Sequence, residues 1–199
     1  MQASRKKLPI GIQTFRQIRE DAYYYVDKTP LAMRLIEDGK CYFLSRPRRF
    51  GKSLFLDTLA ELFEGHRELF DGLAAASQWD WSRRFPVIRL SFADGVLTSR
   101  EALDKRIEDL LRINREALGV ATHPGLDIPG QFGDLIRKAH AATGERAVVL
   151  VDEYDKPILD NITKPDMARE MRDGLRNLYS VIKGADAHLR FAFLTGVSK

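Results

Sequence analysis

The chain of 199 residues lacks several features that would place it in a specialised class of protein. Its one cysteine, Cys41, cannot form an internal disulfide and is not part of a zinc-ligand cluster, so we interpret it as a small apolar strand residue. No apolar run approaches the roughly 20 residues that span a bilayer, and residues 1–7 lack the apolar stretch of a secretory signal. We therefore expect a cytoplasmic protein with no membrane partner.

An excess of one charge is also largely missing. The net charge is +4 and the pI is about 9.2, which permits nucleic-acid binding without requiring it. Hydrophobic residues make up 44% and charged residues 30%, the ordinary balance of a globular protein, and the length suits one domain. We expect one domain over residues 1–199.

The order of apolar segments predicts the fold class. Four runs bounded by turn residues predict strands, at Cys41–Leu44, Val87–Phe92, Ala147–Val151 and Leu189–Leu194. Helical spacing of apolar residues predicts helices over residues 53–63, 99–118, 132–142 and 167–182, and residues 123–130 read as a loop. Alternating strands and helices predict an α/β fold with a mostly parallel sheet flanked by helices.

The most informative segment is Cys41–Leu54, in which an apolar strand is followed by a short basic loop and then by Gly51-Lys52-Ser53 at the start of a helix. This is the context of a phosphate-binding P-loop, because free backbone N–H groups and the helix dipole attract an anion there. Gly51 lets the backbone approach a phosphate, Lys52 reaches the terminal phosphates, and the Ser53 hydroxyl ligates Mg²⁺.

One position departs from the usual pattern, since G-x-x-x-x-G-K-[ST] has glycine where this chain has Arg46. The alternative interpretation is a solvated basic loop of Arg46, Arg48 and Arg49. Arginine also binds phosphate in a bidentate manner, and the sequence leaves open which of the three faces the ligand.

A buried strand ending in two carboxylates follows about a hundred residues later, at Ala147–Glu153. We expect Asp152 to lie on the Mg²⁺ side and Glu153 to act as general base toward the attacking water, which is the Walker B pattern. Ligands bind outside the carboxyl ends of strands in such sheets, so Thr195 is a candidate sensor of the γ-phosphate. The alternative is a small polar residue that starts a turn at Gly196.

These features, with two further segments, make nearly the whole chain resemble a known family. The segments are Tyr24–Thr29, Ser45–Leu54, Phe85–Ile88, Val151–Pro157 and Leu194–Lys199. They are similar to the predicted AAA-ATPase-like family, whose members often carry a PD-(D/E)XK nuclease-like region after the ATPase part. The resemblance implies that arginine is normal at position 46 and that the sheet is of the additional-strand P-loop type. Residues 189–194 would then lie between the first and third strands, with Val87–Phe92 outside the third.

The resemblance also has implications for both ends of the chain. It implies that residues 1–40 pack near the nucleotide and that Tyr25–Thr29 approach the adenine or lie under the loop. A helix-cap neighbourhood is the alternative for Asp27 and Lys28, and the better one for Lys28, with Thr29-Pro30 starting a helix at Leu31–Ile36. Resembling proteins continue into a fifth strand, a lid and an effector region, so we expect a fragment without them. An oligomer, and nucleic acid bound through that region, are compatible partners.

The expected function is Mg²⁺-dependent binding and hydrolysis of ATP that drives or regulates a C-terminal effector. Catalysis is assigned to Glu153 and Thr195, and Mg²⁺ to Ser53 and Asp152. The expected nucleotide contacts are Arg46, Arg49, Phe50, Gly51, Lys52, Ser53 and Leu54. Two alternatives stay open: a nucleotide-binding regulatory domain with negligible hydrolysis, and a DNA-binding module that uses the loop arginines. The choice between ATP and GTP also stays open, although no guanine-reading Asn-Lys-x-Asp segment is present.

Overall fold

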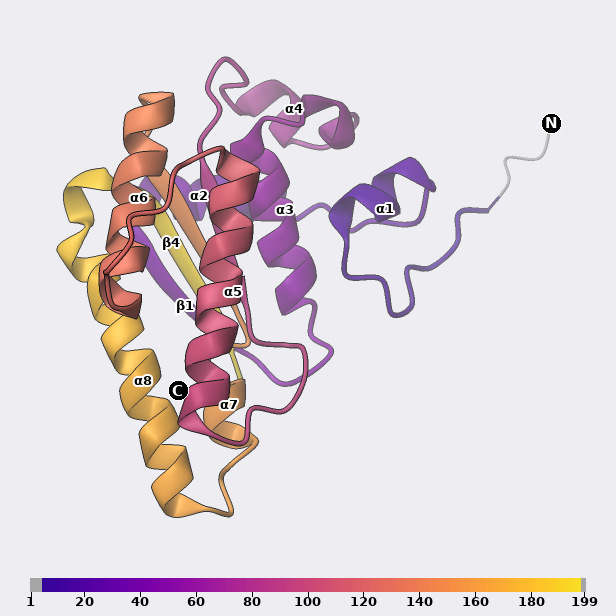
Figure 1. Ribbon diagram of the computed structural model, residues 1–199. Helices are drawn as coiled ribbons and strands as arrows, with labels where there is room; N and C mark the ends of the chain where they lie inside the picture. Colours follow the sequence, from indigo (N-terminus) through magenta and orange to yellow (C-terminus); the bar gives the residue numbers. More distant parts are fainter. Residues whose placement is uncertain (1–4, 198–199) are drawn as a thin grey trace.

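A computed structural model describes residues 5–197 and contains one parallel sheet between two layers of helices (Figure 1). The strands are β1 (Cys41–Ser45), β2 (Val87–Ser91), β3 (Ala147–Asp152) and β4 (Leu189–Gly196). Their order in the sheet is β1-β4-β3-β2, and every neighbouring pair is parallel. The predicted strand order is therefore confirmed: β4 lies between β1 and β3, and β2 lies outside β3.

The helices lie on both faces of the sheet. They are α1 (Phe15–Glu20), α2 (Thr29–Asp38), α3 (Lys52–Glu64), α4 (Ala75–Gln78), α5 (Arg100–Leu118), α6 (Ile128–Thr143), α7 (Lys156–Leu159) and α8 (Pro165–Gly184), with 3₁₀ turns η1 (Arg67–Phe70) and η2 (Asp186–His188). In Figure 1, α5, α6 and α8 cover the near face, and α2 and α3 lie behind the sheet. The short helices α1, α4 and α7 are too short for a periodic apolar pattern and were not predicted.

The prediction of a loop over residues 123–130 is wrong at its end, because α6 begins at Ile128. Asp127 precedes the helix in an extended conformation, and its carboxylate accepts a hydrogen bond from the Gly130 N–H at 2.9 Å. Pro129 occupies the first turn, where its missing N–H has no cost. The proline and glycine therefore belong to a helix start.

Each strand contributes alternate residues to two apolar cores. On β3, Val149 and Val151 pack in the core under α5, α6 and α8, whereas Val148 and Leu150 pack in the core under α2 and α3. All four side chains have no exposed surface. This explains why β3 is apolar at successive positions instead of alternate ones.

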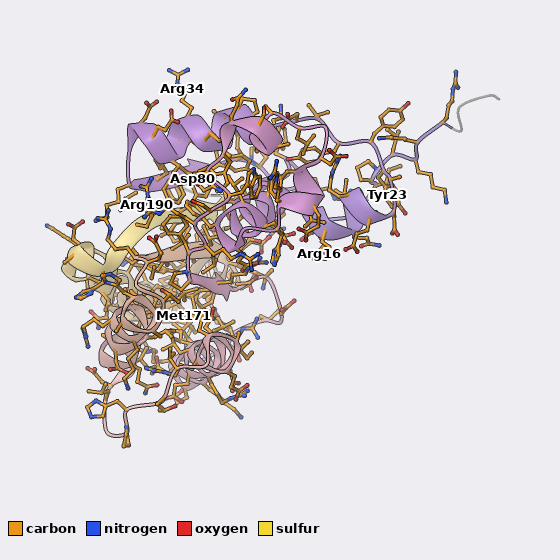
Figure 2. The ribbon with its side chains drawn as sticks, turned by 90° about the horizontal axis from the view of Figure 1, so that it is seen from above. Arg16, Tyr23, Arg34, Asp80, Met171 and Arg190 are labelled. Atoms are coloured by element: carbon orange, nitrogen blue, oxygen red, sulfur yellow. The ribbon has the colours of Figure 1, made fainter. Side chains whose placement is uncertain are left out.

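The N-terminal segment is attached to the outer side of α3. Phe15 and Ile18 of α1 are fully buried, and the Phe15 N–H donates to Asp57 at 2.7 Å. Arg16 forms an ion pair with Glu61 at 3.0 Å. Figure 2, viewed from above, shows Arg16 and Tyr23 on this extension and Met171 in the opposite helical layer. The segment before β1 is thus packed against the core of the sheet domain.

Two expectations from composition bear on the fold. Cys41 does lie in β1, but its side chain is exposed because β1 is an edge strand of the sheet. Within residues 5–197, none of the helices combines the length and the apolar character needed to cross a membrane.

Candidate functional site

The basic loop, residues 46–51, leaves β1 and enters α3 at the C-terminal edge of the sheet. Arg49 and Gly51 both adopt left-handed backbone conformations, with φ of 66° and 75°. A Cβ on Gly51 would meet no atom within 4 Å, so glycine is favoured there by the backbone conformation and not by lack of space. Arg46, Arg48 and Arg49 are all exposed.

Lys52, the first residue of α3, is folded under the basic loop. Only 6% of its surface is exposed, and its ammonium donates to the carbonyls of Arg46 at 2.9 Å and Pro47 at 3.1 Å. Gly51 precedes the helix and makes no side-chain cap. The first-turn amides of α3 are therefore donors without intrahelical partners, next to a buried cation, which is an arrangement that suits an anion.

The acidic turn, residues 152–155, follows β3 at the same edge. Asp152 is 8% exposed, and its Oδ1 accepts a 2.5 Å hydrogen bond from the fully buried Thr195 hydroxyl. The Thr195 oxygen in turn accepts from the Glu153 N–H at 3.3 Å. Thr195 therefore contacts both residues of the carboxylate pair.

Strand β4 connects the basic loop with the acidic turn. The Arg46 N–H donates to the carbonyl of Gly196 at 3.2 Å, one residue after Thr195 in the chain. The neighbouring Ser45 hydroxyl donates to the carbonyl of Val197 at 3.1 Å. Because β4 lies between β1 and β3, the two predicted motifs are one strand apart at a common edge. In Figure 1 this edge is at the lower end of the sheet, where α7 lies.

An apolar groove of about 720 Å³ runs beside the basic loop. Its lining includes Tyr24, Val26 and Lys28 from the segment before β1, Phe50 from the basic loop and Leu54 from α3. Tyr24, Val26 and Phe50 are at least half exposed. The segment before β1 therefore forms a wall of a groove that opens at the candidate anion site.

Asp27, in the same segment, makes hydrogen bonds at the start of α2 that agree with the capping interpretation, and a further one to Ala74 that sequence reasoning missed. Its Oδ1 accepts from both the N–H and the hydroxyl of Thr29, at 2.8 and 2.7 Å, and its Oδ2 accepts from the Ala74 N–H at 2.8 Å. Lys28 occupies the N-cap position, as the capping interpretation requires, but its side chain makes no capping hydrogen bond and borders the groove. The Asp-x-Thr spacing was the available signal.

Oxygen donors that suit Mg²⁺ are present at the common edge. Ser53 in the first turn of α3 offers a hydroxyl, and Asp152 offers a carboxylate; both are hard ligands of the kind that Mg²⁺ prefers. A different cluster, Glu61, Glu64 and His66, lies at the other end of α3. Its carboxylates already pair with Arg16 and Arg89, at 3.0 and 3.1 Å, so it is neutralised without a metal.

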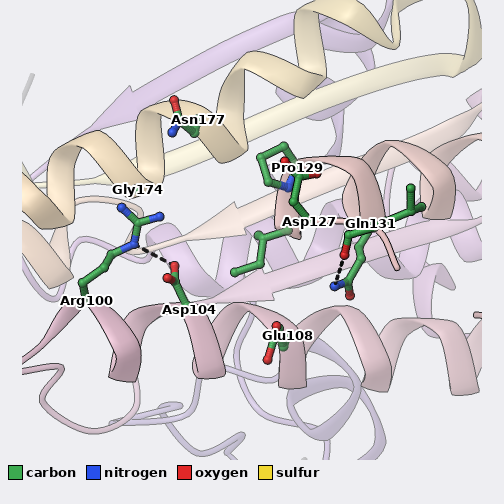
Figure 3. A pocket seen from close by; sticks show the side chains of 10 residues that line it. Arg100, Asp104, Glu108, Asp127, Pro129, Gln131, Gly174 and Asn177 are labelled. Carbon is green, nitrogen blue, oxygen red and sulfur yellow. Dashed lines mark hydrogen bonds and ion pairs between the residues drawn. The ribbon is translucent and has the colours of Figure 1, made fainter. Parts of the chain in front are cut away.

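A second cavity, of about 360 Å³, lies between α5, α6 and α8 (Figure 3). Arg100 on its wall donates to Asp104 at 2.8 Å. A Cβ on Gly174 of α8 would lie 3.1 Å from the Arg100 guanidinium, so this glycine permits the close approach of α5 and α8. None of the predicted site residues lines this cavity.

The parallel sheet with helices on both faces places the chain in the class of α/β proteins. More specifically, the chain belongs to the family described as Predicted AAA-ATPase, whose model matches residues 9–199. It is 67% identical over 197 residues to the "Uncharacterized protein in vnfD 5'region" of Azotobacter chroococcum mcd 1, covering 98% of this chain and 38% of that relative. The chain thus spans well under half the length of this relative. No solved structure matches the chain.

Proposed function

We propose that the chain binds Mg²⁺-ATP at the basic loop and hydrolyses it, as a P-loop ATPase of the additional-strand type. The observation that carries this proposal is the convergence of Lys52, Asp152 and Thr195 on one sheet edge, linked through β4. Lys52 is 6% exposed, and the hydrogen-bond acceptors of its ammonium within residues 5–197 are neutral carbonyls, so a bound anion would supply the counter-charge that this buried cation favours. Membership of the predicted AAA-ATPase family supports the same function.

In this proposal the phosphates bind at the first turn of α3. The amides of Lys52, Ser53 and Leu54 donate to phosphate oxygens, and the helix dipole adds favourable charge. Lys52 exchanges its two neutral carbonyl acceptors for charged oxygens, which form stronger hydrogen bonds. Arg46 and Arg49 add positive charge from the exposed side of the loop.

Ser53 and Asp152 are the residues that would hold Mg²⁺. When bound, the ion neutralises the charge that develops on the phosphate oxygens. Thr195 keeps the Asp152 carboxylate in one orientation through its 2.5 Å hydrogen bond. A preoriented carboxylate does not have to be ordered when the ion binds, which favours binding.

Glu153 is the proposed general base. Its side chain is half-buried and follows the carboxylate assigned to the metal, and its own amide is fastened to Thr195. The carboxylate orients the attacking water and accepts its proton, while the phosphate groups are held by the loop. Thr195 would then connect the metal side with the water side of the reaction.

The apolar groove is the proposed place of the base. Its walls carry the rings of Tyr24, Tyr25, Tyr42 and Phe50, which suit the flat face of a purine. The groove joins the basic loop at Arg46 and Gly51, so a base there would lie next to its phosphates. We propose that turnover serves a further region of the protein, since the relative is much longer than this chain.

Replacement of Lys52 by alanine tests the proposal. One charge-assisted hydrogen bond contributes about 1.5–3 kcal/mol, so the variant should bind Mg²⁺-ATP at least about tenfold to a hundredfold more weakly in calorimetry. Lys105→Ala, an exposed lysine on α5, is the matched control and should bind like the wild type. Equal affinity of Lys52→Ala and the wild type would remove the assignment.

A further inference from the structure

The acidic turn is fastened to the end of β4 by bonds that the catalytic assignment does not use. Beyond the Thr195 hydroxyl bonds, the Tyr154 N–H donates to the carbonyl of Thr195 at 3.0 Å. The Asp155 carboxylate accepts from the Val197 N–H through Oδ2 at 2.9 Å. Asp155 is 2% exposed, so its carboxylate, like that of Asp152, is buried.

Gly196 is required by the closeness of this contact. A Cβ at that position would lie 2.4 Å from Cε1 of Tyr154 and 2.8 Å from Oδ1 of Asp155. The Tyr154 ring also packs edge-on against Phe43 of β1, with ring centroids 5.0 Å apart. The turn therefore lies directly on the end of β4, with side chains from β1 and β4 fixing its position.

The backbone conformation of Glu153 indicates what these hydrogen bonds do. Its φ is 51°, in the left-handed region that is unfavourable for any residue with a Cβ. Such a conformation persists only where the surroundings determine it. The hydrogen bonds on either side of Glu153, to Thr195 and through Asp155 to Val197, are those surroundings.

We propose that Asp155 is a positioning residue, which holds Glu153 in its left-handed conformation by fastening the acidic turn to the end of β4. This proposal rests on the proposed function, because the conformation of Glu153 affects hydrolysis only if Glu153 acts as the general base. Asp155 itself needs no contact with the nucleotide. Its loss should therefore lower kcat and leave the affinity for Mg²⁺-ATP unchanged.

The test compares four variants in the full-length protein. Asp155→Ala removes the acceptor, Asp155→Asn restores one acceptor oxygen, and Gly196→Ala displaces Tyr154 and Asp155 from the strand end. Asp160→Ala is the matched control, because this carboxylate pairs with Lys156 at 2.5 Å outside the turn. Calorimetry with Mg²⁺ and a non-hydrolysable ATP analogue gives the affinity, phosphate release gives kcat, and hydrogen exchange reports the amides of Glu153 and Val197.

A shift of about 1 Å in a reacting group can cost about a hundredfold in rate, and Asp155→Ala should approach that loss in kcat at wild-type affinity. Asp155→Asn should recover part of it, and Gly196→Ala should resemble Asp155→Ala. In a Glu153→Gln background, Asp155→Ala should change the residual rate by less than about twofold, because both act through one group. If Asp155→Ala does not fold, Asp155→Asn and Gly196→Ala provide the same comparison of kcat with the affinity for Mg²⁺-ATP.

Wild-type kcat in Asp155→Ala, or equal losses of kcat and affinity, would overturn the positioning role. A wild-type protein without ATP turnover would instead overturn the proposed function. In that case hydrogen exchange still decides about Asp155: faster exchange at Glu153 and Val197 in Asp155→Ala supports the fastening, and unchanged exchange refutes it.

Discussion

The two halves of the candidate site are built in opposite ways. The basic loop is exposed from Arg46 to Gly51, and its carbonyls bond to the Lys52 ammonium. The acidic turn is held against β4, and its Asp152 and Asp155 carboxylates are 8% and 2% exposed. We propose that the exposed half adjusts to phosphate groups, whereas the carboxylates of the buried half are held in place beforehand. In our account the first supplies binding and the second supplies preorganised chemistry.

The difference in how firmly the two halves are held is tested most clearly by removing one hydroxyl at each. Thr195→Val leaves a buried carboxylate and the Glu153 amide without their shared partner, so we expect it to lower the free energy of unfolding by about 2–3 kcal/mol. Ser53→Ala, at the first turn of α3, should cost less than about 0.5 kcal/mol. Urea unfolding measures both. Equal costs would mean that the acidic turn is no more strongly fixed than the loop.

The start of α2, where Asp27 accepts hydrogen bonds from Thr29 and Ala74, should respond to acid. Burial raises the pKa of Asp27, but the hydrogen bonds from Ala74 and Thr29 outweigh it and leave the pKa below its ordinary value. The folded state thus favours the carboxylate, so its contribution is complete above the unfolded pKa and is lost as the pH falls through the lowered one. Asp27→Asn should cost about 1–2 kcal/mol at neutral pH and less in acid. A pH-independent difference in urea unfolding would contradict this.

The smallest expected effect concerns the backbone of the basic loop. Arg49 has a positive φ and Arg48 does not, so glycine relieves strain only at position 49. Arg49→Gly should therefore leave the protein about 1 kcal/mol more stable than Arg48→Gly, since the left-handed penalty is about 1–2 kcal/mol per residue. Thermal unfolding of the two variants compares them directly. The reverse order would show that the loop conformation at Arg49 is not a source of strain.

The fold was predictable from the sequence because its strands are short, mostly apolar runs with clear boundaries. The strand ends differ by one or two residues: β4, for example, extends to Gly196 beyond the predicted end at Leu194. The polar residues at these ends, Thr195 among them, carry no apolar signal but continue the sheet ladder. The order of β1, β4 and β3 came from the resemblance to the family, since apolar spacing does not encode which strands pair.

The candidate site was predictable only where motifs mark it. The sequence indicated Lys52, Asp152 and Thr195, because strand ends and helix starts locate them. It gave no sign of Asp155 as a partner of Val197, a contact between residues far apart in the chain. Nor did it indicate that Lys52 bonds to the loop carbonyls, because that geometry depends on the left-handed residues Arg49 and Gly51.

The central claim is that the loop binds the nucleotide and the acidic turn hydrolyses it. Substitution of Glu153 and of Asp152 separates these roles. Glu153→Gln keeps the shape of the side chain and removes the base. Loss of a general base costs about a hundredfold to ten-thousandfold in rate, or roughly 3–5 kcal/mol of barrier. Asp152→Asn should instead weaken the Mg²⁺ dependence of binding, because that carboxylate is assigned to the ion.

The most direct measurement is therefore phosphate release and Mg²⁺-ATP affinity for Glu153→Gln and wild type, side by side in the full-length protein. The account predicts wild-type affinity and nearly abolished turnover in the variant. Turnover at the wild-type rate would contradict the catalytic role of Glu153. In that case another group would act on the attacking water, whereas negligible turnover in the wild type itself would make a nucleotide-binding regulatory domain the better description of the chain.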